Sequence, residues 1–192
     1  DSMNEIEAAS VFYTLSTIAQ VLAAFIALSS IFVFYKINED QSEMKIIAYA
    51  SIESLECIKL SDCSYINSIN RIRKDYENGS IYGVISGLDL LVEEYLLDSA
   101  TEVLPTAMLH RDLIIGIQSN IKRLLRFTKR SIWIGVLDIV ICIITLSLIP
   151  IISFLFLKII MILVIVLAIL SLIIMVGVIF YALKNRKTGY LS

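Results

Sequence analysis

The sequence has few of the side chains that most often bind metals or perform catalysis. It contains one histidine, His110, and three cysteines. No pair of these residues has the spacing of a metal site, and Gly-rich phosphate loops and the HExxH and GxSxG motifs are absent from the sequence. We therefore expect no enzymatic activity, no cofactor and no metal, and we interpret His110 as a structural or exposed residue.

The cysteines Cys57, Cys63 and Cys142 are too few for a disulfide framework. Cys142 falls in a long apolar segment, and the other two fall in a region that we expect to be cytoplasmic, where thiols stay reduced. Alternation of apolar and polar residues with a period of two is also missing over any convincing length, so we predict no strands.

Apolar residues, in contrast, are abundant and make up 58% of the 192 residues. The block 131–183 contains only two charged residues, Asp138 and Lys158. Since a helix that spans a bilayer needs about 20 apolar residues, this block predicts two transmembrane helices, 131–150 and 156–183.

A third apolar segment, 11–35, has an acidic flank and is too long for the core of a signal peptide, so we predict a retained span. Lys and Arg near the spans lie on one side of the membrane if the N-terminus is outside, as cytoplasmic flanks require. We therefore predict an all-α, multi-pass integral protein of the cell membrane. Its predicted parts are an extracellular N-terminus (1–10), a cytoplasmic helical domain (36–130) and a cytoplasmic C-terminus (184–192).

A basic run lies immediately before the second predicted span. Its position favours contact with anionic lipid headgroups, and we do not expect nucleic acid as a partner. The predicted headgroup residues are Lys122, Arg123, Arg126, Lys129 and Arg130.

Apolar spacing within the cytoplasmic domain predicts helices over 42–60, 64–77 and 81–103. The first would bury a face of Met44, Ala48, Ile52 and Leu55, and Asn78-Gly79-Ser80 would end the second.

Pro105 is expected to end the third of these helices, and Thr106 is expected to be the N-cap of the next. No Pro or run of Gly separates Thr106 from Ile149. We therefore predict one continuous helix, about 66 Å long at 1.5 Å per residue, that passes through Arg130 and Ser131 into the second span.

An acidic ridge of Glu94, Asp98 and Glu102 would lie on the helix predicted over 81–103, at spacings of four. Like charges at this spacing destabilise a helix slightly. The ridge is either a regulatory site for a cation or a partner, or a solvated face, which is the more common role of such runs.

Small and polar residues of the first two spans fall on one helical stripe each. The first-span stripe is Ser16, Gln20, Ala23, Ala27 and Ser30, and the second-span stripe is Ser131, Gly135, Asp138, Cys142 and Thr145. Such stripes either line a pore or pack against a neighbouring helix. The third span offers little but aliphatic surface, so we expect it to face lipid at the periphery of an assembly.

Asp138 is the most informative residue, because an acid at the centre of a span costs roughly 2.5–3.5 kcal/mol. One interpretation is a cation or proton site beside a polar cavity. The other is a carboxylate that snorkels to the interface or bonds Ser29 or Ser30 of the first span.

Two functions follow from these patterns. The first is a homo-oligomeric channel or pore, with a ring of Asp138 side chains that favours cations and a cytoplasmic bundle that regulates it. The second is a non-conducting adaptor or sensor, whose stripes only pack the spans together and whose cytoplasmic helices bind a partner protein. Membrane lipid, a second copy of the chain and a cation are thus the expected partners.

Overall fold

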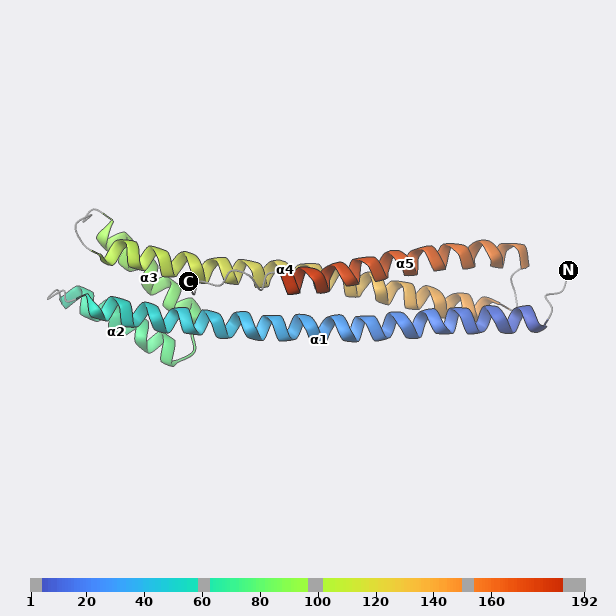
Figure 1. Cartoon of the computed structure of the whole chain (residues 1–192), viewed down its shortest axis with the longest axis horizontal. Coiled ribbons are helices and arrows are strands. Elements are labelled where there is room, and N and C mark those ends of the chain that lie inside the picture. Colours follow the sequence, from blue (N-terminus) through green and yellow to red (C-terminus); the bar gives the residue numbers. More distant parts are fainter. Residues whose placement is uncertain (1–4, 59–62, 97–101, 150–153, 185–192) are drawn as a thin grey trace. The chain divides into compact units, whose positions relative to one another are not determined.

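A computed structural model of the chain describes residues 5–58, 63–96, 102–149 and 154–184 (Figure 1). Every regular element within these ranges is an α-helix, and none is a strand, which confirms the predicted all-α class. The helices are α1 (Glu5–Cys57), α2 (Cys63–Glu77), α3 (Ile81–Tyr95), α4 (Val103–Leu148) and α5 (Phe154–Lys184).

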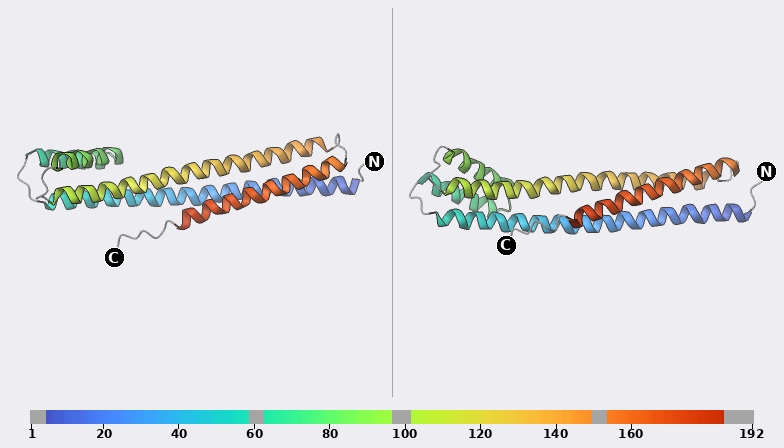
Figure 2. Two further views of the ribbon diagram at one scale, coloured as in Figure 1. Left: turned by 90° about the horizontal axis from the view of Figure 1, so that it is seen from above. Right: turned by 45° about the horizontal axis from the view of Figure 1, so that its top comes forward.

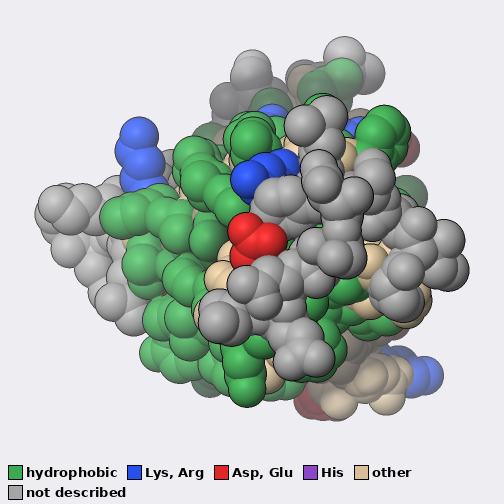
Figure 3. All heavy atoms as spheres, turned by 90° about the vertical axis from the view of Figure 1, so that its right-hand side faces the viewer, with side chains coloured by type: hydrophobic (Ala, Val, Ile, Leu, Met, Phe, Trp, Pro, Cys, Tyr) green, Lys and Arg blue, Asp and Glu red, His purple; other side chains and the backbone are tan. Residues whose placement is uncertain are grey.

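Three of these helices are long and apolar enough to cross a membrane. Their apolar stretches fall within Glu7–Cys57, Val103–Leu148 and Phe156–Lys184, which correspond to the three predicted spans. Figure 3 views the molecule from one end, and the described side chains on that face are mostly hydrophobic. Length and composition therefore support a multi-pass membrane protein.

α1 and α4 each continue well beyond a single span. The continuous helix predicted through Arg130 and Ser131 is confirmed, because α4 is unbroken over 46 residues. The first span and the helix predicted over 42–60, however, form one helix of 53 residues. No Gly or Pro occurs between Tyr35 and Ser42 to end that helix, so the separation that we expected there is wrong.

The predictions at Pro105 and Thr106 are also wrong. α3 ends at Tyr95, and α4 begins at Val103, before the proline. The first N–H groups of a helix have no partner within it, so Pro105 costs nothing in the first turn of α4. Thr106 is not an N-cap, because it lies inside α4 and its hydroxyl donates to the Glu102 carbonyl at 2.7 Å.

The chain divides into two compact units. We call residues 1–36 and 123–192 the span unit, and residues 37–122 the helical unit. α1, α4 and α5 contribute to the span unit, where they run side by side (Figure 2).

The helical unit has a large apolar core, which includes the predicted face of Met44, Ala48, Ile52 and Leu55. α2 and α3 form a hairpin in this unit. Gly79 makes the turn with a φ of 72°, which side chains other than Gly rarely adopt. Ser80 then caps α3 by accepting a hydrogen bond from the Gly83 N–H at 3.1 Å.

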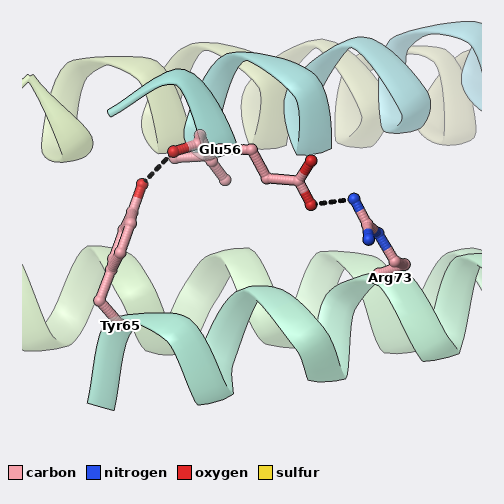
Figure 4. A network of polar contacts seen from close by, with 4 residues as sticks. Glu56, Tyr65 and Arg73 are labelled. Carbon is pink, nitrogen blue, oxygen red and sulfur yellow. Dashed lines mark hydrogen bonds and ion pairs between the residues drawn. The ribbon is translucent and has the colours of Figure 1, made fainter. Parts of the chain in front are cut away.

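Two polar contacts join α2 to the end of α1 (Figure 4). Tyr65 donates its hydroxyl to the Leu55 carbonyl at 2.5 Å, and Arg73 forms an ion pair with Glu56. Burial raises the pKa of Tyr65 to about 12, and the nearby Tyr95 and Glu56 add to this shift.

Candidate functional site

The three helices of the span unit meet at Gly135. A Cβ added there would overlap Met175 Cε of α5 and lie 3.0 Å from Ile26 Cδ1 of α1. Small residues allow such close approach between helices in membranes. Gly135 therefore marks a level at which α1, α4 and α5 all pack together.

A second level of packing lies seven residues further along α4. Leu15, Cys142 and Val164 form a buried cluster there, one residue from each helix. From the first level to the second, the residue number rises along α4 and falls along α1 and α5. α4 is therefore antiparallel to both neighbours, and Asp138 lies between the two levels.

Asp138 is buried, with only 4% of its surface exposed. Its Oδ2 accepts a hydrogen bond from the hydroxyl of Ser171, which is buried near the middle of α5. This contact joins the acid of one predicted span to the central hydroxyl of another. A hydrogen-bonded, protein-facing position is what a polar group at this depth requires.

The predicted partners of Asp138 in the first span do not bind it. Ser29 and Ser30 donate their hydroxyls within α1, to the carbonyls of Phe25 and Ile26 at 2.7 and 2.8 Å. The helix register explains the difference. Ile26 is level with Gly135, so Ser29 and Ser30 lie on one side of that level and Asp138 on the other.

The rest of the second-span stripe is also buried within the span unit. Ser131, Gly135, Cys142 and Thr145 all lie on the face of α4 that packs inside this unit. Thr145 donates to the Ile141 carbonyl at 2.8 Å. Within the single chain this stripe therefore forms helix contacts, and its lining of a pore stays a prediction.

The first-span stripe is placed differently. Gln20, Ala23 and Ala27 are exposed, whereas Ser16 and Ser30 are half-buried. α1 buries another face, which contains Leu15, Leu22, Ser29 and Val33. The protomer therefore presents a polar and small-residue surface at the level of the spans.

α5 buries one face of its own, with residues mostly three or four apart. This face contains Leu157, Val164, Ala168, Ser171, Met175, Val178 and Ala182. Its other faces expose large aliphatic residues, such as Ile162 and Ile173. Its position at the periphery of an assembly stays a prediction.

The predicted headgroup residues are all exposed along α4. Lys122 belongs to the helical unit, and its ammonium lies 5.9 Å from the centroid of the Tyr82 ring. Arg123, Arg126 and Arg130 surround a hollow of about 210 Å³ in the span unit.

The acidic ridge does not lie on one helix, because α3 ends at Tyr95 and α4 begins at Val103. Glu94 accepts a hydrogen bond from Ser64 at 2.5 Å, and Asp98 lies outside the described residues. Arg111 of α4 forms an ion pair with Asp89 of α3.

Within the part of the chain that the structure describes, no three His, Cys, Asp or Glu residues gather as metal ligands. His110 Nδ1 lies 3.0 Å from the Thr106 carbonyl oxygen.

The contact between Ser171 and Asp138 was missed at the level of the sequence. A signal was available, because a single hydroxyl in the middle of an aliphatic span needs a hydrogen-bond partner. Ser171 and Asp138 are the polar residues that lie furthest from the ends of their spans.

Neither a protein-family model, nor a curated protein, nor a solved structure matches this chain.

Proposed function

We propose that this chain forms a homo-oligomeric membrane channel in which the first-span stripe surrounds the conducting pathway. The observation behind the proposal is the exposure of Gln20, Ala23 and Ala27 on the protomer. A glutamine amide near the middle of a span cannot be left in hydrocarbon without hydrogen-bond partners. Water in a pore, or a second copy of the chain, supplies them.

Symmetric assembly would bring the first-span stripes of several chains together. In a closed ring, each protomer turns the same face towards the axis, so the Gln20 side chains would form a polar ring there. The exposed aliphatic faces of α5 would then contact lipid.

Asp138 has a different role in this proposal from the one expected of a selectivity ring. Its carboxylate faces Ser171 inside the protomer, where it holds α4 against α5. The preference for cations that a ring of Asp138 would supply is therefore not part of the proposal.

The proposed orientation places the N-terminus outside and both the helical unit and Ser192 in the cytoplasm, because basic residues flank the corresponding ends of the spans. A tag at each terminus tests this orientation. Tags that are accessible from the same side would contradict three spans.

Cysteine labelling tests the channel. The native Cys57, Cys63 and Cys142 are replaced by Ala, and single cysteines are introduced by Ala23→Cys, Ala27→Cys and, as a control, Leu28→Cys. Leu28 is 45% exposed and points away from the stripe at 100° per residue. A membrane-impermeant thiol reagent should label the two stripe positions and not the control.

Planar-bilayer recordings of the purified oligomer complete the test. Ion flux that is blocked by the reagent at Ala23→Cys or Ala27→Cys would support a pathway along the stripe. Absence of flux under varied voltage, tension and ionic conditions, together with unlabelled stripe cysteines, would exclude it.

The second candidate is an adaptor whose helical unit binds a partner protein. It is favoured by exposed apolar side chains on that unit, among them Ile46, Tyr49, Ile66 and Tyr82. Such residues often mark interaction surfaces when they are contiguous. An adaptor predicts that stripe cysteines pack against protein and stay unlabelled in the assembled state.

A further inference from the structure

A groove of about 390 Å³ lies between α4 and α5 in the span unit. Its walls are apolar and include Ile134, Ile174 and Val178, and Gly177 widens it because that residue has no side chain. At the end nearest the basic run, Phe127 and Tyr181 face each other across the groove with ring centroids 6.0 Å apart. Aromatic residues of this kind are typical of a membrane interface.

The groove adjoins the arginine hollow described above. Phe127 and Arg130 line both, so the apolar groove leads directly into the basic arginine hollow. Among the described residues, no carboxylate pairs with Arg123 or Arg130. The hollow therefore has the charge to receive an anion.

Ser131 adds an independent sign of a missing ligand. It lines the groove and exposes only 3% of its surface. Its Oγ has no hydrogen-bond partner among the described residues. Other buried hydroxyls of these helices are satisfied, such as Thr128, which donates to the Leu124 carbonyl at 2.8 Å. An unsatisfied buried hydroxyl calls for an explanation, and an unseen acceptor is one.

We propose that the groove and the arginine hollow together bind one anionic phospholipid. One acyl chain occupies the groove, the phosphate lies among Arg123, Arg126 and Arg130, and Ser131 donates to an oxygen of the ester region. Guanidinium groups suit phosphate oxygens, and an amphipathic ligand fits a site with one apolar and one basic part. This site is distinct from the first-span stripe, so it stands or falls separately from the proposed channel.

The hollow at the opposite end of the spans offers a useful contrast. It is lined by both Glu7 and Lys158, so it lacks the excess of positive charge that selects an anionic headgroup. We therefore place the lipid only at the arginine end.

Lipid titration of the purified full chain, followed by native mass spectrometry, tests the proposal. Phosphatidylglycerol and phosphatidylcholine with identical acyl chains are the probes. We expect one phosphatidylglycerol per protomer, bound at least about fivefold more tightly than phosphatidylcholine, as loss of a headgroup charge near several arginines predicts.

Two pairs of variants separate the headgroup from the acyl chain. Arg130→Gln should weaken phosphatidylglycerol binding about fivefold, while Lys129→Gln, which changes the neighbouring charge outside both hollows, should leave it within about twofold. A Cβ at Gly177 meets nothing within 4 Å, so Gly177→Leu adds its side chain where the groove is open. It should abolish tight binding of either lipid, and Gly116→Leu, equally open but in the helical unit, should not.

Three results would overturn the proposal. They are equal affinity for the two lipids, unchanged phosphatidylglycerol binding in Gly177→Leu, and equal losses in Arg130→Gln and Lys129→Gln. Millimolar inorganic phosphate should not displace the lipid, and full displacement would reveal a simple anion site without an acyl subsite. Melting temperatures identify a variant that fails to fold. Ser131→Ala removes only a hydroxyl, and it should reduce the increase in melting temperature that phosphatidylglycerol produces.

Discussion

The span unit and the helical unit are both helical bundles, but they bury different side chains. The helical unit encloses large apolar residues such as Leu55, Ile72 and Leu88. The span unit also buries large apolar residues such as Leu15 and Leu157, but it contains most of the buried polar ones. Of the nine buried polar residues in the described part of the chain, seven lie in the span unit: Ser29, Lys36, Thr128, Ser131, Asp138, Thr145 and Ser171.

The exposed surfaces differ in the opposite sense. Trp133, Ile162 and Phe180 of the span unit are all about two-thirds exposed, at 66%, 64% and 67%. The helical unit carries ion pairs on its surface, such as that between Arg73 and Glu56. The helical unit also exposes apolar side chains such as Ile46 and Tyr82, but the apolar stretches long enough to cross a membrane lie in the helices of the span unit.

Different forces therefore hold the two units together. Removal of apolar surface from water stabilises the helical unit. Lipid tails are as apolar as leucine, so the span unit depends on close contacts at small residues and on interhelical hydrogen bonds. An exposed polar group is ordinary on the helical unit, whereas an exposed side chain such as Gln20 is unusual on the span unit.

The largest expected effect concerns the core of the helical unit. Leu88→Ala removes a side chain with no exposed surface and should lower the free energy of unfolding by about 2–5 kcal/mol. Leu90→Ala on the same helix removes a side chain that is 42% exposed and should cost much less. Denaturant unfolding followed by circular dichroism measures both. Equal losses would show that this unit is not held by a water-excluded core.

In the span unit, a small-to-large substitution should lower the stability. Gly135→Val adds volume where a Cβ would overlap the terminal methyl of Met175. Overpacking typically costs about 1–3 kcal/mol, and we expect the lower end, about 1 kcal/mol, because the flexible Met175 side chain can move. Gly177→Val adds the same atoms where there is open space and serves as the control. Thermal unfolding in detergent should separate them, and indistinguishable melting temperatures would argue against close contact of the three helices at Gly135.

Sequence periodicity predicted the helical unit well, because water imposes a strong pattern on it. The spacing of Met44, Ala48, Ile52 and Leu55 identified a buried face, and Asn78-Gly79-Ser80 identified a turn. Helix-breaking residues were less reliable for predicting where the helices begin and end. Pro105 falls in the first turn of α4, where the sequence around it gave no sign of the earlier start at Val103.

The arrangement of the spans was much less predictable. α5 is almost uniformly aliphatic, so no pattern showed which face packs inside, and the contact of Ser171 with Asp138 depended on a register set by Gly135. The basic run was predicted to meet headgroups. The groove beside it could not be predicted, since it depends on how Gly177 and Tyr181 of α5 face α4.

A smaller effect is expected from the polar contact inside the span unit. A double-mutant cycle of Asp138→Ala and Ser171→Ala, each of which removes one partner of the hydrogen bond, should give a coupling of about 0.6 kcal/mol, and no more than about 1.7. Asn keeps an oxygen that can accept from Ser171, so Asp138→Asn should leave both oligomer assembly and any ion selectivity unchanged. Altered selectivity in this variant would return Asp138 to the conducting pathway.

An effect of similar size concerns the buried Tyr65 hydroxyl of the helical unit. Tyr65→Phe removes the hydrogen bond to the Leu55 carbonyl, which is 2.5 Å long, and should cost about 0.5–1.5 kcal/mol near neutral pH. The carbonyl is not left unsatisfied, because it also accepts from the Ile58 N–H at 3.1 Å. Tyr82→Phe, at a side chain that is 69% exposed, is the control and should change stability little.

The pH dependence of the same variant distinguishes a buried hydroxyl from an accessible one. In the folded chain the pKa of Tyr65 is raised from 10.0 to about 12, so the folded state retains this proton over a range in which the unfolded state loses it. The resulting stabilisation is complete below pH 10 and is lost as the pH rises to about 12. The difference in unfolding free energy between the wild type and Tyr65→Phe should therefore shrink across that range, and Tyr65→Phe itself lacks the titrating hydroxyl. A constant difference for Tyr65→Phe would mean that the hydroxyl is open to water, and the helical unit would then lack the dry core that separates it from the span unit.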